Sequence, residues 1–283
     1  MKFAVIGDRG LVGSSMAAFL KTNKVDFRGF NRDNLDLNHE TPGSLGEKLL
    51  EFDVVVNCVG YTAVDKAEIE PDKAIHLNGT LPGVLANACL ISGSRLAHIS
   101  TDYVFDGAND FPYLVTDKTN PVSVYGISKA MGERNIESSG VSSTIFRSAW
   151  LYAQNSSCFP LTIANRLVRG QGVKVVDDQW GQPTWAQDLA AQIFSFMSMD
   201  SSPSIVHAVS SGKTNWYEFA SEIARSLNLK PSNLVIPVSS GEFPTAATRP
   251  AWSVLDNSSD LVEPIGDWRE RWLVAADEIL GPR

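Results

Sequence analysis

Tyr125 and Lys129 have the types and the spacing to pass a proton to a substrate. Residues four apart on a helix lie on one face, one turn apart. A free tyrosine titrates at about pH 10, too high for efficient proton exchange at neutral pH, and an adjacent ammonium stabilises the phenolate and lowers that pKa. Thr101 adds a hydroxyl that could hold a substrate oxygen. The pair alone is a weak signal, because two common residues fall at this spacing by chance in many proteins.

The elements that would position these residues alternate between strand patterns and helical patterns. A long helix is expected at 71–92, and a second helix carries Tyr125 and Lys129 and ends near Ser138. Strands are expected at 2–6, 26–30, 53–58, 95–100 and 143–147. This alternation predicts an α/β fold with a Rossmann-type, doubly wound parallel sheet. Thr101 then lies at the carboxyl end of the fourth strand.

The alternation of strand and helix patterns becomes less regular after Arg147, and we use this change to divide the chain. We place a dinucleotide-binding Rossmann domain at 1–150 and a smaller C-terminal substrate-binding lobe mainly at 151–283, with segments near 173–210 returning to the first domain. Further strands are expected at 173–176 and 204–209, and further helices at 159–169, 184–197 and 214–227. Prolines at 231, 237, 244 and 250 predict a loop-rich tail.

A glycine turn follows the first strand, where Gly7, Gly10 and Gly13 are spaced three apart. The physics is that of a dinucleotide site: the backbone comes close to a pyrophosphate, and a helix N-terminus faces its negative charge. The spacing differs from the usual G-x-G-x-x-G pattern, and a tight turn without a ligand is the alternative. The position after the first strand favours a nucleotide. The expected contacts are Gly7, Arg9, Gly10, Leu11, Val12 and Gly13.

The end of the second strand bears on the choice between cofactors. An acidic residue there holds the ribose 2′-hydroxyl of NAD, whereas an arginine accommodates a 2′-phosphate. The strand ends with Asn31, Arg32 and Asp33, so Arg32, with help from Arg9, favours NADPH. NADH is the alternative, if Arg32 is only solvated and Asp33 holds the ribose.

Composition narrows the class of protein. The chain has 283 residues and a net charge of −8, which argues against non-specific attraction to nucleic acid or to an anionic membrane. Its three cysteines are far apart and show no metal-ligand spacing, which fits a reducing, cytoplasmic location. No signal peptide or apolar run of membrane-spanning length is expected.

Several longer motifs together resemble one family, the dTDP-4-dehydrorhamnose reductases, within the extended short-chain dehydrogenases/reductases. The resemblance covers nearly the whole chain, and its long strings are far more specific than Y-x-x-x-K. The matching segments are residues 7–13, 57–68 (NCVGYTAVDKAE), 100–107 (STDYVFDG), 125–129 (YGISK), 147–152 (RSAWLY), 178–184 (DQWGQPT) and 249–253 (RPAWS).

The resemblance implies hydride transfer from the nicotinamide to C4 of a nucleotide-linked 4-keto-6-deoxy sugar, most simply dTDP-4-dehydro-L-rhamnose, which would give dTDP-L-rhamnose. Tyr125 would donate the proton, Lys129 would lower the tyrosine pKa and hold the nicotinamide ribose, and Thr101 would polarise the carbonyl. The implied cofactor contacts are Asn31, Arg32, Asp36, Leu37, Val59, Gly60, Tyr61, Tyr125 and Lys129. The implied sugar contacts are Thr62, Val64, Thr101, Asp102, Tyr103, Tyr125 and Trp150.

Some features leave the substrate or a metal site undecided, and others have a purely structural interpretation. Departures from the family pattern at 58–60, Val115, Ala149 and 155–159 lie near the substrate pocket and leave the exact sugar undecided. Asp65 and Glu68 are more simply a solvated helix start than participants in chemistry. Some family members need Mg²⁺ at a dimer interface, but no acidic ligand set can be placed here, and the sequence decides neither this nor whether the chain forms a homodimer.

Two other functions remain as alternatives. One is a reductase of a different dTDP-4-keto-deoxysugar in a secondary-metabolite pathway. The other is a non-catalytic NADP-binding regulatory subunit, since the regulatory subunit of methionine adenosyltransferase shares this fold and many of these motifs. The intact set of Thr101, Tyr125 and Lys129 favours an enzyme.

Overall fold

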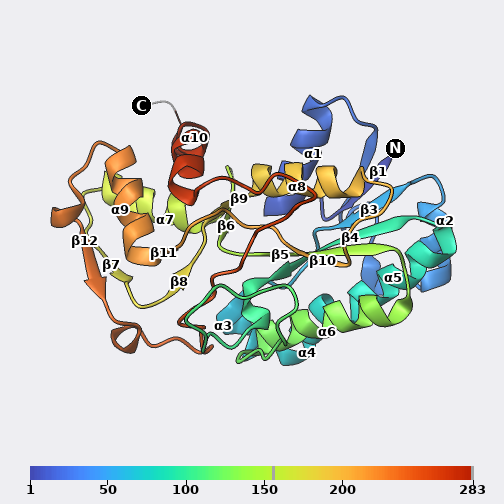
Figure 1. Cartoon of the computed structure of the whole chain (residues 1–283), viewed down its shortest axis with the longest axis horizontal. Helices are drawn as coiled ribbons and strands as arrows, with labels where there is room; N and C mark the ends of the chain where they lie inside the picture. The colour runs from blue at the N-terminus through green and yellow to red at the C-terminus, as the bar shows by residue number, and fades with distance from the viewer. Residues whose placement is uncertain (155–156, 282–283) are drawn as a thin grey trace.

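A six-stranded parallel sheet forms the centre of the larger part of the chain, with strand order β10-β5-β4-β3-β1-β2 (Figure 1). The computed structural model describes residues 1–154 and 157–281. The strands are β1 (Phe3–Ile6), β2 (Phe27–Phe30), β3 (Val54–Asn57), β4 (Arg95–Thr101), β5 (Ser143–Ser148) and β10 (Ile205–His207). The α/β, doubly wound fold expected from the sequence is confirmed.

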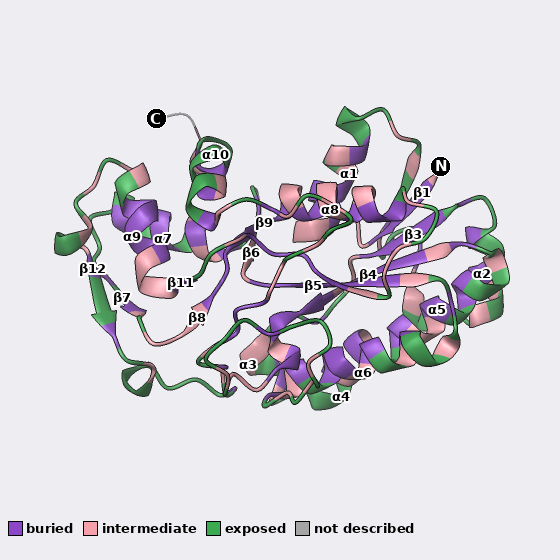
Figure 2. Cartoon of the chain, in the orientation of Figure 1, coloured by how far each residue is buried: buried purple, intermediate pink, exposed green. Residues whose placement is uncertain are grey.

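Helices cover both faces of this sheet, because its central strands are apolar on both sides. Phe3 and Val5 of β1 face α1 (Leu11–Thr22) and α8 (Ala186–Met197). Ala4 and Ile6 face α2 (Pro42–Leu49), α5 (Leu81–Ser92) and α6 (Val124–Ser139). Figure 2 shows the strands buried and the outer helix faces exposed. A near-continuous apolar strand is typical of a parallel sheet that is covered on both faces.

Residues 71–92 form one helical segment: α4 (Pro71–Ile75), a π turn (His76–Thr80) and α5. By length and composition this segment could cross a membrane, contrary to the expectation that no such run exists. Its most apolar window is 56% buried inside the protein, and it packs against α2 and α6. Such burial is that of a core helix.

A smaller lobe is built around a separate core. It contains α7 (Phe159–Val168), α9 (Trp216–Ser226), α10 (Trp268–Leu280) and a parallel pair, β7 (Val173–Val176) with β12 (Val235–Val238). Two short ladders, β6 (Leu151–Tyr152) with β9 (Thr184–Trp185) and β8 (Trp180–Gly181) with β11 (Thr214–Asn215), lie between the lobe and the sheet (Figure 1).

Two sequence expectations are corrected here. Within 173–210, α8 packs on α1 and β10 joins the large sheet, but β7 does not return to it: β12 is its partner. The tail is not loop-rich throughout, because it contains the helix α10, whose N-cap is Asp267. That helix buries Trp268, Trp272 and Ile279 in the lobe core, which is a helical spacing.

Candidate active site

The glycine turn brings β1 and α1 into unusually close contact. Gly7 has a φ of +87°, which favours glycine. A Cβ atom on Gly13 would lie 2.0 Å from the carbonyl oxygen of Gly7, so no larger residue fits there. Gly10 is the N-cap of α1 and brings no side chain of its own to the first helical amides. The turn therefore fits a pyrophosphate, whose oxygens would accept from those amides.

A cavity of about 530 Å³ opens beside this turn, where β1, β2 and β3 end. Nine of the residues predicted to hold the cofactor line it: Gly7, Arg9, Gly10, Asn31, Arg32, Asp36, Leu37, Val59 and Gly60. Leu35, Asn38, Leu77 and Leu81 line it too, and the sequence had not assigned them. Leu77 and Leu81 lie four apart on the helical segment after β3, a spacing that could have identified them.

The charges at the cavity mouth suit a cofactor with an extra phosphate. Arg32 is exposed, and Arg9 forms an ion pair with Asp33. The Asn31 side chain is held within the protein, because its amide donates to Asp8 Oδ1 at 3.1 Å. Arg32 fits the 2′-phosphate of NADP, and the ion pair with Arg9 leaves the Asp33 carboxylate less free to hold a ribose.

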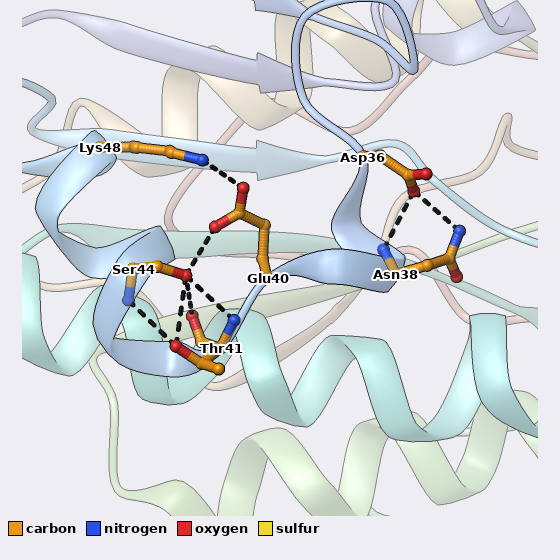
Figure 3. A network of polar contacts seen from close by, with 6 residues as sticks. All are labelled: Asp36, Asn38, Glu40, Thr41, Ser44 and Lys48. Carbon is orange, nitrogen blue, oxygen red and sulfur yellow. Dashed lines mark hydrogen bonds and ion pairs between the residues drawn. The ribbon is translucent and has the colours of Figure 1, made fainter.

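The loop after β2 is held by polar contacts within the loop and with α2 (Figure 3). Asp36 Oδ1 accepts from the backbone amide of Asn38 at 3.1 Å and from its side-chain amide at 2.8 Å. The backbone hydrogen bond is the main reason that the pKa of Asp36 is lowered. Glu40 accepts from Ser44 Oγ at 2.6 Å and pairs with Lys48. This loop thus presents Asp36 and Leu37 to the cavity as a preformed wall.

Tyr61 faces away from this cavity. Its hydroxyl donates to Glu70 Oε2 at 2.7 Å, and its backbone amide donates to Asn78 Oδ1 at 2.7 Å. Tyr61 belongs to a small apolar cluster with Ala67 and Ala74, against which Tyr125 packs. Leu11, Val12 and Gly13 are not among the residues that line the cavity. They form the first turn of α1, which begins beside it.

Thr101, Tyr125 and Lys129 meet at the carboxyl edge of the sheet, as predicted. Thr101 is the last residue of β4, and its Oγ1 donates to Asp102 Oδ1 at 2.9 Å. Lys129 is buried on α6, and its Nζ donates to the carbonyl oxygen of Ile99. A Cβ on Gly126 would lie 2.2 Å from the Tyr103 carbonyl oxygen. The glycine beside Tyr125 therefore lets α6 approach the end of β4.

The pKa values at this edge depart from the sequence expectation. Burial raises the pKa of Tyr125 to about 12, against a hydrogen bond with Thr101 that lowers it. Burial lowers the pKa of Lys129 to about 8, against the nearby charge of Glu133. Lys129 is not among the groups that shift the pKa of Tyr125, so the expected lowering by Lys129 is not found here. At neutral pH Tyr125 is a protonated phenol, as a proton donor must be.

Asp102 and Tyr103 flank this trio. Asp102 is 2% exposed, and its Oδ2 has no hydrogen-bond partner within the described part of the chain. Burial raises the pKa of its carboxyl to about 6. The ring of Tyr103 meets that of Tyr125 edge to face, with centroids 5.8 Å apart. Both residues therefore border the position at which a substrate carbonyl would meet Tyr125.

Trp150 is held in a strained conformation just after β5. Its φ is +45°, which is rare for a large residue. Its ring lies flat on that of Trp216 in α9, with centroids 3.6 Å apart. A Cβ on Gly181 would lie 2.6 Å from the Trp150 ring. Strain held in place by packing from two elements is typical of functional sites.

The other two predicted sugar contacts follow β3. Thr62 is exposed, and Val64 begins the short helix α3 (Val64–Ala67), which packs on α6. Asp65 lies in this helix and Glu68 directly follows it, and both have partners within the protein instead of being only solvated. Glu68 Oε1 accepts from the amide of Val124, the first residue of α6, at 2.8 Å. Asp65 pairs with Arg249. The sequence signal that could have indicated these contacts is that both residues lie inside the segment at 57–68, which matches the family pattern.

No histidine is among the three residues that meet at this edge. His98 and His207 are buried, and His76 bonds to Asn38 at the cavity wall. Among residues 1–154 and 157–281, no group of three or more His, Cys, Asp or Glu side chains could hold a metal ion. The Mg²⁺ site that the family resemblance left open therefore has no support in this chain.

A glycine turn, a threonine at a strand end and a Tyr–Lys helix on one edge of a parallel sheet define an NAD(P)-dependent oxidoreductase of the short-chain dehydrogenase/reductase class. The RmlD substrate binding domain family matches residues 1–280, and the chain belongs to that family.

Known proteins similar over their full length include enzymes with different named substrates. A dTDP-4-dehydrorhamnose reductase from Burkholderia thailandensis is 36% identical, over 95% of this chain and 96% of the relative. A probable dTDP-4,6-dihydroxy-2-methyloxan-3-one 4-ketoreductase from Streptomyces antibioticus is 35% identical, over 99% and 96%. The crystal structure of dTDP-4-dehydrorhamnose reductase from Bacillus anthracis in complex with NADP is similar with a TM-score of 0.90, 28% identity and coverage of 99% and 98%.

Proposed function

We propose that this chain reduces the C4 keto group of a dTDP-linked 4-keto-6-deoxy sugar with NADPH, and that dTDP-4-dehydro-L-rhamnose is the substrate. The observation that carries the proposal is the contact between Thr101 and Tyr125, at the end of β4, on the sheet edge where the dinucleotide cavity opens. The names of similar reductases support the substrate class.

The nicotinamide, when bound, supplies the hydride that reaches the carbonyl carbon. Tyr125 gives its phenolic proton to the carbonyl oxygen as negative charge develops there. Thr101 Oγ1 lies beside the phenol and stabilises the same oxygen by a hydrogen bond. Lys129 brings a positive charge near the phenolate that remains, which stabilises it until a proton returns.

Trp150 is the residue on which we base the choice of sugar. Trp216 and Gly181 fix the plane of its ring, and a flat indole is a suitable surface for the apolar face of a 6-deoxy sugar. A Trp216→Leu variant should raise KM for the sugar several-fold and leave KM for NADPH unchanged. Tyr217→Leu, at the next position of α9, is the control, since the ring of Trp150 stacks on Trp216 and not on Tyr217.

The direct test is a comparison of substrates. NADPH oxidation is followed with dTDP-4-dehydro-L-rhamnose and with dTDP-4-keto-6-deoxy-D-glucose, and each product is analysed after hydrolysis. A kcat/KM at least tenfold higher for the rhamnose precursor supports the proposal. A preference for the second sugar would move the chain to another deoxysugar pathway. NADPH binding without turnover of either sugar would favour a regulatory subunit.

The cofactor preference rests on Arg32. It is exposed at the cavity mouth, while Asp33 is engaged by Arg9. Replacing Arg32 with Ala should raise KM for NADPH by roughly tenfold and change KM for NADH little, since only NADPH carries the 2′-phosphate. A wild-type enzyme that prefers NADH would overturn this assignment.

A further inference from the structure

Glu133 is a buried carboxylate that the reduction as described does not use. It lies four residues after Lys129 on α6 and is 3% exposed. It accepts from Ser100 Oγ, from Arg147 Nε at 3.1 and 3.3 Å, and from Arg147 Nη2 at 2.8 Å. Arg147 is also 3% exposed, so both charges have been removed from water.

These bonds join three elements directly behind the proposed site. Ser100 lies between Ile99, whose carbonyl oxygen accepts from Lys129, and Thr101, which bonds to Tyr125. Arg147 comes from β5, the neighbour of β4, and is paired with Ser100 in the strand register. The Glu133 carboxylate thus attaches α6 to β4 at the residue between the two contacts that define the site.

A contribution to the stability of the fold does not by itself explain a buried ion pair such as Glu133–Arg147. The cost of desolvating two charges is often as large as their attraction, and apolar residues of similar volume can be equally stable. The titratable groups that interact with Lys129 are Cys58 after β3, His98 on β4 and Glu133 on α6. Of these, Glu133 brings the negative charge, and its guanidinium partner is seated against the Phe105 ring at 5.2 Å.

We propose that Glu133 is a positioning residue of the reduction, which through Ser100 and Arg147 holds β4 against α6 at the depth where Lys129 reaches Ile99 and Thr101 reaches Tyr125. This inference rests on the proposed function for its kinetic readout. It also gives Glu133 a second effect, because its charge favours the ammonium form of Lys129.

The pH profile separates this role from simple support of the fold. If the reduction needs the ammonium form of Lys129, kcat/KM falls as pH rises through the pKa of that group. Glu133→Gln keeps the shape and removes the charge, so this alkaline limb should move to lower pH by about one unit. Glu137→Gln, an exposed change one turn further along α6, is the control and should leave the limb in place. A limb at the same pH in all three proteins would overturn the inference.

Ser100→Ala keeps the test decisive if Glu133→Gln does not fold. It removes one hydrogen bond and leaves the ion pair intact. Its kcat should fall by roughly three- to tenfold with the alkaline limb unmoved, as expected for lost alignment without a change of charge. An unchanged kcat in Ser100→Ala would contradict the positioning role.

A readout without substrate distinguishes this inference from the proposed function. In protein labelled with ¹⁵N-lysine, the titration of Lys129 Nζ can be followed by NMR, with Lys129→Met for assignment. The midpoint should be lower in Glu133→Gln than in wild type, whether or not any sugar is reduced. Equal midpoints would overturn the inference, whereas failure to reduce every sugar tested would overturn only the proposed function.

Discussion

Asp65 and Arg249 form a bidentate ion pair across 184 residues of chain, with Oδ2–Nη2 at 2.6 Å and Oδ1–Nη1 at 3.1 Å. Asp65 also accepts from the amide of Ala247 at 3.1 Å. Burial acts to lower the pKa of Arg249, but hydrogen bonds to Asp65 and to Tyr103 together raise it. Since Tyr103 packs edge to face on Tyr125, the pair connects the segment after β3 and the C-terminal segment to the proposed proton donor.

Breaking this pair should affect catalysis more than stability. The Asp65 side chain is 45% exposed, so Asp65→Asn should cost about 1 kcal/mol or less of unfolding free energy. We expect kcat/KM to fall about tenfold, because a small displacement of Tyr103 misaligns Tyr125. Steady-state kinetics and urea unfolding measure the two effects. Asp72→Asn, on the exposed first turn of α4, is the control. Equal kinetics in the two variants would show that the pair does not reach the site.

Gly13 and Gly43 should respond in opposite ways to alanine. At Gly13 the new Cβ would meet the Gly7 carbonyl oxygen at 2.0 Å, so the turn must move, at a cost of about 2 kcal/mol or more. At Gly43 the nearest atom is Thr41 Oγ1 at 3.9 Å, and alanine should stabilise α2 by about 0.5–1 kcal/mol.

Urea unfolding and NADPH titration of both variants check this prediction. Gly13→Ala should also weaken NADPH binding, whereas Gly43→Ala should bind like wild type. Unchanged NADPH affinity in a folded Gly13→Ala protein would contradict the assignment of this turn to the pyrophosphate.

Asp102 should make the protein less stable as pH rises. Its pKa is about 6 in the folded state, because of burial, against an ordinary value of 3.8. The folded state therefore binds the proton more tightly, and the stability that this provides is present below about pH 4 and lost as pH rises through 6. Relative to Asp102→Asn, wild type should lose on the order of 2–3 kcal/mol between pH 4 and pH 7.

The measurement is urea unfolding of both proteins at several pH values. Acid unfolding from other groups is common to both and cancels in the difference. A difference that is flat with pH, or that favours wild type at pH 7, would contradict the burial of a charged carboxylate at this position.

Local spacing allowed the elements that carry the candidate site to be predicted from the sequence. The four-residue interval of Tyr125 and Lys129, and the strand, glycine turn and helix at the N-terminus, depend on contacts within a few residues. The same is true of α10, whose helical spacing was present although the preceding prolines favoured a loop.

Contacts between distant segments could not be predicted in this way. Glu68 bonds to Val124 across 56 residues, and β12 joins β7 rather than the large sheet. Nor does spacing reveal burial, which raises the pKa of Tyr125 where proximity to Lys129 alone would lower it. These features depend on the folded chain and not on local spacing.

The most direct test of the whole account is the rate of NADPH oxidation with dTDP-4-dehydro-L-rhamnose in wild type and in Tyr125→Phe. Tyr217→Phe is the matched control, since Tyr217 lies on α9 and packs against the core of the smaller lobe. Loss of the proton donor should lower kcat by roughly 10²–10⁴-fold in Tyr125→Phe, with NADPH affinity within about threefold of wild type. Equal rates in wild type and Tyr125→Phe would contradict the central claim that this phenol gives its proton to the substrate.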